Sequence, residues 1–311
     1  MNQLSIEKRT QIITLLVEGN SLRSTSRISG CSINTVTKLL VDVGQACIEF
    51  HNRTVRNISA RRVEVDEILS FVYAKQKTAN REDFTYEDKA GDVWTWVGID
   101  AESKLIISYL VGTRGAESAN EFMHDIADRV NGRIQLTSDG HTAYLEAVDN
   151  AFGIDIDYAR LVKLYGSSGE GGSATTGKYS PAVCTGAKKT RVSGHPNEKY
   201  VSTSYVERQN LTMRMAMRRF TRLTNAFSKK LENHIYAIAI HFIYMNFVRI
   251  HTTLRVPPAM QAGLVKELWE IEDIVRLADD KKKAEEIPAP TKPKSDVNQV
   301  AKSITKALDK Y

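Results

Sequence analysis

The sequence predicts a mixed α/β fold that is preceded by a small all-α domain. Residues 1–60 place apolar side chains at the spacing of short helices, whereas from residue 61 onward strand-like segments are interleaved with helical ones. The 311 residues are 42% hydrophobic and 26% charged, which is typical of a globular protein and excludes a largely disordered chain.

The chain divides into three predicted regions. Residues 1–60 form a helix-turn-helix domain, and residues 61–265 form the α/β domain, with an insertion at about 166–204 where the sequence is rich in Gly, Ser and Thr. Residues 266–311 are predicted to be a helix followed by a Lys/Pro-rich tail, disordered from about residue 280.

Three short helices are predicted in the first region. They begin after Ser5, Ser21 and Ser32, which are suitable N-cap residues, and the third helix covers 33–44 after a turn at Gly30. This pattern fits a DNA-reading helix-turn-helix, and a plain three-helix bundle is the alternative. The candidate DNA contacts in this region are Arg23, Arg27, Asn34, Thr35 and Lys38.

The α/β region is predicted to run strand-strand-strand-helix-strand-helix-strand. Alternating apolar residues predict the strands, and two of them, joined by the short segment AES, look like a hairpin. Trp94 and Trp96 alternate with apolar residues in the second strand and are predicted to pack in the core. The first predicted strand begins at Arg62, and the others cover 93–100, 104–112, 133–139 and 154–165. Helices are predicted over 116–130 and 141–152.

Three further helices follow the insertion. The first begins at Tyr205, the second covers 228–247 and the third covers 259–278. The first is strongly basic, and its arginines suit a phosphate backbone, although a solvated charged face is the plainer interpretation. These arginines are Arg208, Arg214, Arg218, Arg219 and Arg222.

Three acidic residues are candidates for a metal centre. Asp66 lies in the first strand, Asp139 ends a later strand, and Glu207 lies at the start of the basic helix. A carboxylate in an apolar strand is costly unless it is paired or bound to a cation, and hard oxygen ligands favour Mg²⁺ or Mn²⁺. The alternative is that Asp139 is only a turn residue and Glu207 only favours the start of a helix. Asp100 and Glu67 are rival candidates for the metal ligands.

Charge, cysteine content and hydropathy indicate the kind of partner and the cellular compartment to expect. The net charge of +6 permits a polyanionic partner, and three well-separated cysteines argue against a disulfide scaffold or a cysteine-based zinc site. The most apolar stretch, 235–245, is shorter than the roughly 20 residues of a membrane span. We therefore expect a protein without a membrane partner, in the cytoplasm and associated with the nucleoid.

The motifs VEVDEILSFV, LTSDGHTAY and YVERQNLTMRMAMRRF, in this order, resemble the IS1-type DDE transposases of bacterial insertion sequences. The resemblance covers about residues 62–264 and implies an RNase H-like mixed sheet with flanking helices. It also implies that Asp66, Asp139 and Glu207 are catalytic and bind two Mg²⁺ or Mn²⁺ ions. The implied activity is cleavage and strand transfer at element ends.

The same resemblance implies double-stranded DNA as the partner, both as element ends and as target, and a homodimer or larger assembly on it. Residues 21–44 match the DNA-recognition helices of the family. The chain departs from better-known relatives because it lacks a Cys-rich zinc element before these helices and has His141 where an aromatic residue is usual. Two other functions remain open: a helix-turn-helix DNA-binding regulator, and an RNase H-like nuclease without strand transfer.

Overall fold

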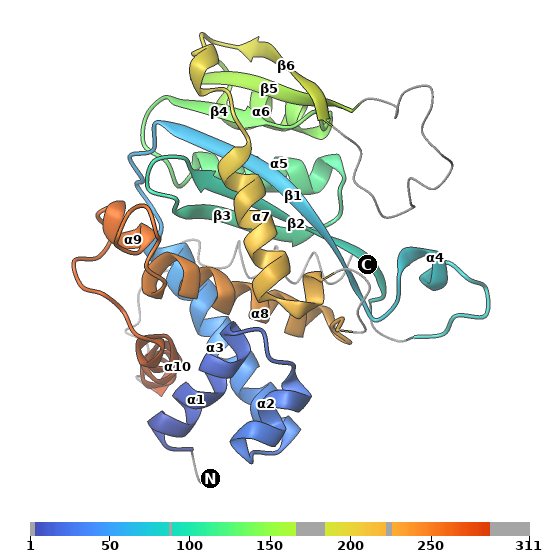
Figure 1. The fold of residues 1–311 in the computed structure, drawn as a ribbon, viewed down its shortest axis with the longest axis vertical. Coiled ribbons are helices and arrows are strands. Elements are labelled where there is room, and N and C mark those ends of the chain that lie inside the picture. The colour runs from blue at the N-terminus through green and yellow to red at the C-terminus, as the bar shows by residue number, and fades with distance from the viewer. Residues whose placement is uncertain (1–3, 87–88, 166–183, 222–225, 287–311) are drawn as a thin grey trace.

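The computed structural model describes residues 4–86, 89–165, 184–221 and 226–286. Figure 1 shows a twisted sheet with helices on both faces and, beside it, a group of helices from the two ends of the chain. The structure is thus a mixed α/β fold with flanking helices, as the sequence predicted.

The first three helices begin where the serine caps predict. The side chains of Ser5, Ser21 and Ser32 each accept the backbone N–H three residues further on, at 3.0 to 3.3 Å. Gly30 adopts φ +69° between the second and third helix, a conformation that favours glycine. The helices are α1 Ile6–Val17, α2 Leu22–Ser29 and α3 Ile33–Thr54.

The predicted end of the third helix at residue 44 is wrong, because α3 continues for another ten residues to Thr54. Gly44 lies where α3 packs against α8, Leu231–Ile243. A Cβ at this position would lie 2.3 Å from the Cβ of Tyr236. Gly44 therefore permits a close approach of two helices and does not end one.

Six strands form one sheet in the order β3-β2-β1-β4-β5-β6. The central strand β1 pairs antiparallel with β2 and parallel with β4. β4 is parallel to β5, and β6 is antiparallel to β5. The strands are β1 Arg62–Val72, β2 Gly91–Asp100, β3 Ile106–Gly112, β4 Ile134–Ser138, β5 Ile156–Tyr165 and β6 Cys184–Ser193.

The predicted insertion at 166–204 is more regular than expected. Its described part contains β6, which extends the sheet, and a 3₁₀ turn at Glu198–Tyr200. Residues 166–183 lie outside the described residues. The polar loop between β1 and β2 likewise contains a short helix, α4 Gln76–Ala79.

Helices cover both faces of the sheet. α5 Ala116–Ala127 and α6 Ala143–Phe152 lie behind it in Figure 1, and α7 Ser204–Ala216 crosses its front over β1. Trp96 is fully buried between the sheet and α5 and α6, which confirms its predicted core position, whereas Trp94 is only half-buried. On the front face Ile68 and Val97 pack with Met213 of α7.

The C-terminal helices complete the helical group. The predicted helix 228–247 is α8 followed by a π-helical turn at Tyr244–Val248, and the predicted helix 259–278 is instead α9 Pro258–Gln261 and α10 Ile271–Glu286. Asp279 of α10 accepts two hydrogen bonds from Arg9 of α1, at 2.6 and 3.0 Å. The last described helix therefore packs with the first, and the predicted tail from residue 287 on lies outside the described residues.

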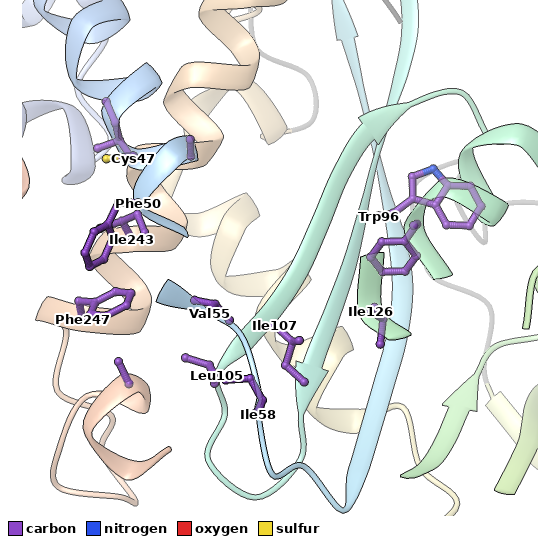
Figure 2. Packing of buried hydrophobic residues seen from close by; sticks show 14 of the residues in the cluster. Cys47, Phe50, Val55, Ile58, Trp96, Leu105, Ile107, Ile126, Ile243 and Phe247 are labelled. Carbon is purple, nitrogen blue, oxygen red and sulfur yellow. The ribbon is translucent and has the colours of Figure 1, made fainter. Parts of the chain in front are cut away.

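The helical group and the sheet share one hydrophobic core. Figure 2 shows Phe50 and Phe247 between the helices, and Val55 and Leu105 where the helices meet the sheet. Trp269 lies against both phenylalanines, with ring centroids 4.9 Å from Phe50 and 5.0 Å from Phe247. No helix in the described ranges is long and apolar enough to cross a membrane.

Hydrogen bonds fix the end of α3 to the sheet domain. Arg129, just after α5, donates to the carbonyl oxygen of Val55 at 3.1 Å and to the side chain of Asn52 at 2.5 Å. The ring of His51 is hydrogen-bonded through Nε2 to the carbonyl oxygen of Ile106 at 3.2 Å. The long helix is therefore attached at its C-terminal end to two parts of the α/β domain.

Candidate metal centre

The register of the sheet brings Asp66 and Asp139 side by side. In the parallel β1–β4 ladder Glu64 is opposite Thr137, an offset of 137 − 64 = 73 residues. The same offset separates Asp66 from Asp139 (139 − 66 = 73), so Asp139, the residue after β4, is level with Asp66. Neighbouring strands are about 4.8 Å apart, which places the two carboxylates within reach of one cation.

A third carboxylate, Glu67, completes this acidic cluster. One oxygen from each of Asp66, Glu67 and Asp139 lies within 4.8 Å of the other two. Both oxygens of Glu67 have partners: Oε1 accepts a hydrogen bond from Arg114, with which it also forms an ion pair, and Oε2 accepts a hydrogen bond from the hydroxyl of Tyr144 at 3.0 Å. Glu67, a rival acid in the sequence, therefore lies in the cluster but is held by other side chains.

Glu207 lies on the helix that crosses these strands. Glu64 Oε2 accepts the backbone N–H groups of Tyr205 and Val206 at 2.7 and 3.1 Å, which ties the start of α7 to β1. One helical turn after Glu207, Asn210 Nδ2 donates to Asp66 Oδ2 at 2.9 Å. The helix is thus bonded to β1 on both sides of Glu207.

The side chain of Glu207 is paired elsewhere in this structure. Its Oε2 forms an ion pair with Lys163 of β5, and its Oε1 accepts a hydrogen bond from Thr203 at 2.6 Å. Of the three predicted ligands, the structure brings Asp66 and Asp139 together and holds Glu207 on the adjacent helix, outside the three-carboxylate cluster.

Burial and like charges make the cluster electrostatically unfavourable without a cation. Burial raises the pKa of Asp66 to about 7, and the negative charges of Glu67 and Asp139 add to this, while the hydrogen bond from Asn210 opposes it. Burial and the nearby carboxylates raise the pKa of Tyr144 well above its usual value, so its hydroxyl remains a donor to Glu67.

The residues present fit a divalent cation. The cluster offers hard oxygen donors at close quarters, and a bound cation would remove the mutual repulsion of the carboxylates. Beside Asp66, the Oδ1 atom of Asn210 is buried and has no hydrogen-bond partner among the described residues. That acceptor is available to a cation or to water bound on it.

The structure exposes most of the predicted DNA contacts of α2 and α3. Arg23, Arg27, Asn34 and Lys38 are exposed, and Lys38 forms an ion pair with Asp42 at 3.3 Å. Thr35 is half-buried, and its hydroxyl is 2.9 Å from that of the capping Ser32. Four of these five side chains therefore face solvent at the start of α3 or on α2.

The arginines of the basic helix differ in how far they are exposed to solvent. Arg208 and Arg218 are exposed, Arg214 is half-buried, and Arg222 lies outside the described residues. Arg219 points inward and donates to the side chain of Ser228 and the carbonyl oxygen of Asn233, both at 2.8 Å. Burial lowers the pKa of Arg219 to about 10, so its place in the structure is that of a packing residue.

The other rival acid, Asp100, is a turn residue. It accepts backbone hydrogen bonds from Glu102 at 3.2 Å and from Ser103 at 2.9 Å in the loop between β2 and β3. It pairs with Val63 in the sheet, three residues along β1 from Asp66. The predicted hairpin turn accounts for this residue without a metal.

Sequence reasoning missed several residues that position the cluster. Glu64 shares a strand face with Asp66, which the alternation in VEVDE could have indicated, and Asn210 lies one turn after Glu207 in ERQN. No local signal links Glu67 to Arg114 or Tyr144, or Glu207 to Lys163, because only the fold brings these residues together.

Comparison with known proteins finds no matching family model and no matching curated protein. Among solved structures, a piggyBac transposase in a synaptic complex with hairpin DNA, determined by cryo-EM, aligns with a TM-score of 0.40 and 12% sequence identity. The alignment covers 97% of this chain and 75% of that chain. A similarity of this size carries no inference about function, which we derive from the side chains of the site.

Proposed function

We propose that the protein is the transposase of an insertion sequence, which cleaves DNA at element ends and joins the ends to target DNA with the help of divalent cations. The observation that supports this most is the register-matched pair Asp66 and Asp139, whose oxygens lie within 4.8 Å of each other beside a helix that carries Glu207. In this proposal all three are catalytic metal ligands.

Each side chain of the site has a defined task in the proposed reaction. Asp66 and Asp139 would hold the cation from adjacent strands, and Glu207 would bind it from α7 in place of its ion pair with Lys163. Asn210 orients Asp66. Two bound Mg²⁺ or Mn²⁺ ions would activate the nucleophile, which is water in cleavage and the 3′-OH in joining, and would stabilise the leaving oxygen. Nothing in this scheme requires a covalent bond between protein and DNA.

The basic surfaces would hold the DNA. Arg208, Arg214 and Arg218 would contact the backbone near the cluster, because phosphate contacts position a duplex without reading its sequence. The exposed residues of α2 and α3, Arg23, Arg27, Asn34 and Lys38, would read the element end. A homodimer or larger assembly would bring two element ends together.

The proposal is tested by metal-dependent nicking of a supercoiled plasmid that carries the DNA flanking the gene. With Mg²⁺ or Mn²⁺, Asp66→Asn, Asp139→Asn and Glu207→Gln each reduce nicking by about 100-fold or more, as expected for lost metal ligands. Asp83→Asn is the matched control, since the side chain of Asp83 is 70% exposed and forms its ion pair with the neighbouring Arg81. Full activity in any of the three variants would show that its residue is not a ligand.

A joining assay separates the proposal from its two alternatives. Pre-cleaved flanking DNA with a free 3′-OH is incubated with a target plasmid and Mg²⁺, and joined products are detected by sequencing. A nuclease without strand transfer nicks the plasmid but gives no joined product. A DNA-binding regulator gives neither nicking nor joining, and its DNA binding is unchanged by Asp66→Asn.

A further inference from the structure

We propose that Arg114, fixed between Glu67 and Trp94, binds the DNA phosphate beside the bond that is cut. This inference rests on the proposed function and adds a substrate contact to that same site. It concerns a side chain on the back face of the sheet, opposite the basic helix α7, and it uses the half-buried Trp94 that core packing does not account for.

The buried carboxylate of Glu67 holds the guanidinium of Arg114. The Glu67 side chain is 1% exposed; its Oε1 accepts a hydrogen bond from Arg114 Nε at 2.8 Å and forms an ion pair with a terminal nitrogen of Arg114 at 2.7 Å. One charge-assisted hydrogen bond, with an ion-pair contact from a second nitrogen of the same guanidinium, fixes its direction as well as its distance. A buried carboxylate also needs such a partner, so Arg114 is not free to swing away.

Two aromatic side chains fix Arg114 further. Its guanidinium carbon lies 4.5 Å from the ring centre of Trp94, a cation–π distance. Its carbonyl oxygen lies 3.2 Å from Nε2 of His141. His141 belongs to the turn that follows Asp139, and its backbone N–H donates to Asp139 Oδ1 at 2.8 Å. The backbone of Arg114 is therefore connected to a proposed metal ligand through one residue.

Arg114 keeps donors for a ligand. A guanidinium has five N–H groups on three nitrogens, and Glu67 contacts Nε and one terminal nitrogen. The side chain of Arg114 is 45% exposed although its partner is buried. The ion pair therefore holds a guanidinium whose remaining N–H groups can reach solvent or a ligand.

The place of the Arg114 guanidinium beside the acidic cluster points to a DNA phosphate as its ligand. A carboxylate oxygen of Glu67 lies within 4.8 Å of an oxygen of Asp66 and of an oxygen of Asp139. Only one carboxylate group therefore separates the guanidinium from the proposed metal ligands. A DNA strand bound with one phosphate at the cation would bring a neighbouring phosphate toward Arg114, and the fork of an arginine matches the oxygens of a phosphate.

The test measures binding of a short fluorescent duplex, spanning the plasmid nick site, in Ca²⁺ to suppress cleavage. Arg114→Gln keeps a donor for Glu67 but removes the charge, and Trp94→Leu keeps the ion pair but removes the ring. Arg62→Gln and Tyr200→Leu are matched controls, because Arg62 has the same arrangement, 4.5 Å from the Tyr200 ring centre and 2.8 Å from Glu102. Arg62 lies at the start of β1, four residues before Asp66.

We expect Arg114→Gln to weaken duplex binding by about 10-fold and to reduce the salt dependence by about one phosphate contact, while Mn²⁺ binding is unchanged. Trp94→Leu weakens binding less, and the two control variants bind as the wild type does. A neutral methylphosphonate beside the nick site costs the wild type the same factor and costs Arg114→Gln nothing further. If Arg114→Gln does not fold, the test rests on whether the methylphosphonate lowers duplex binding less in Trp94→Leu than in the wild type.

Three results overturn the inference: binding by Arg114→Gln that equals that of Arg62→Gln, a methylphosphonate effect that persists in full in Arg114→Gln or Trp94→Leu, or a loss of Mn²⁺ binding in Arg114→Gln. The last would show that Arg114 supports the metal ligands and does not contact DNA. If the wild type never nicks DNA, no nick site is known, and a duplex of arbitrary sequence replaces the nick-site duplex in the binding test. If Arg114→Gln still weakens the salt dependence of duplex binding, the phosphate contact is supported while the proposed cleavage is rejected.

Discussion

At the scale of single residues, the titration of Asp66 makes the stability of the metal-free protein depend on pH. Its pKa in the folded protein is about 7, raised from 3.8, so the folded state binds this proton more tightly than the unfolded chain does. The resulting contribution to stability is present below about pH 4 and is lost as the pH rises to about 7. The difference is at most about 4 kcal/mol.

We therefore expect Asp66→Asn to remove this pH dependence. Urea unfolding in EDTA at pH 5 and pH 8 measures the free energy of unfolding of both proteins, and Asp66→Asn should be the more stable one at pH 8. Mn²⁺ should stabilise the wild type at pH 8 and leave Asp66→Asn unchanged. An equal pH dependence in both proteins would contradict the assignment of this titration to Asp66.

Asn210 is expected to matter through Asp66. Asn210→Leu removes the hydrogen bond to Asp66 Oδ2 and should lower Mn²⁺ affinity by about 10- to 100-fold, as other outer-sphere substitutions do. Duplex binding should change little. Thr212→Ala is the control on the same helix, because its hydroxyl donates only to the carbonyl oxygen of Arg208 among the described contacts. Calorimetric titration with Mn²⁺ checks both variants.

Asp66 and Asp139 could be predicted from the sequence because each lies in or directly after a recognisable strand. Their meeting follows from one number, the register offset, once the strands are known to be neighbours. The partners of Glu67 could not be predicted, because Arg114 is 47 residues away and Tyr144 is 77 residues away. Nothing in the local sequence couples side chains over such separations.

At the scale of elements, the contact between α3 and α8 depends on a residue without a side chain. Gly44→Ala should improve helix propensity by about 1 kcal/mol but forces a Cβ against Tyr236. We expect net destabilisation of about 1–3 kcal/mol, measured by urea unfolding. Gly186→Ala is the control, since its Cβ would meet nothing closer than 4.0 Å. A more stable Gly44→Ala protein would show that the helices can separate at little cost.

The serine caps, the core strands and the order of the elements could be read from the sequence, whereas Gly44 and β6 could not. A glycine late in an apolar helix looks like a helix end, and only the partner helix shows that it is a packing position. β6 has no alternation of buried and exposed residues and is almost wholly exposed. It forms a strand because β5 offers an edge, and its Lys188, Lys189 and Arg191 discourage further pairing.

At the scale of the whole molecule, several exposed basic residues should act together on DNA. If Arg208, Arg218 and the exposed cations of α2 and α3 contact about five phosphates, the slope of log affinity against log salt is about −4 to −5. Arg208→Gln should reduce the slope by about one unit, and Arg219→Gln should leave it unchanged because Arg219 points inward. Duplex titrations over a range of salt concentrations measure this, and binding insensitive to salt would refute the proposed DNA contact.

The division of the chain into regions could be predicted only in part. The helix predicted after residue 266 packs on α1 and α3, with Asp279 bonded to Arg9 across 270 residues of sequence. Its buried residues Ile274, Val275 and Ala278 are too few to indicate their partner. The described C-terminal residues are thus part of the helical group at the start of the chain.

The attachment of α3 to the sheet domain has a consequence for the choice of the bond that is cut. In the proposed function the N-terminal turn of α3 contacts the element end, while its last turn is hydrogen-bonded to Arg129 and Ile106. The 22 residues of α3, about 33 Å in length, separate that turn from the attachment to the α/β domain that carries the acidic cluster. If the proposed function holds, the rigid helix fixes the distance from the recognised bases to the cut, so extra base pairs inserted after those bases would leave the cut at its old distance, now in the inserted DNA.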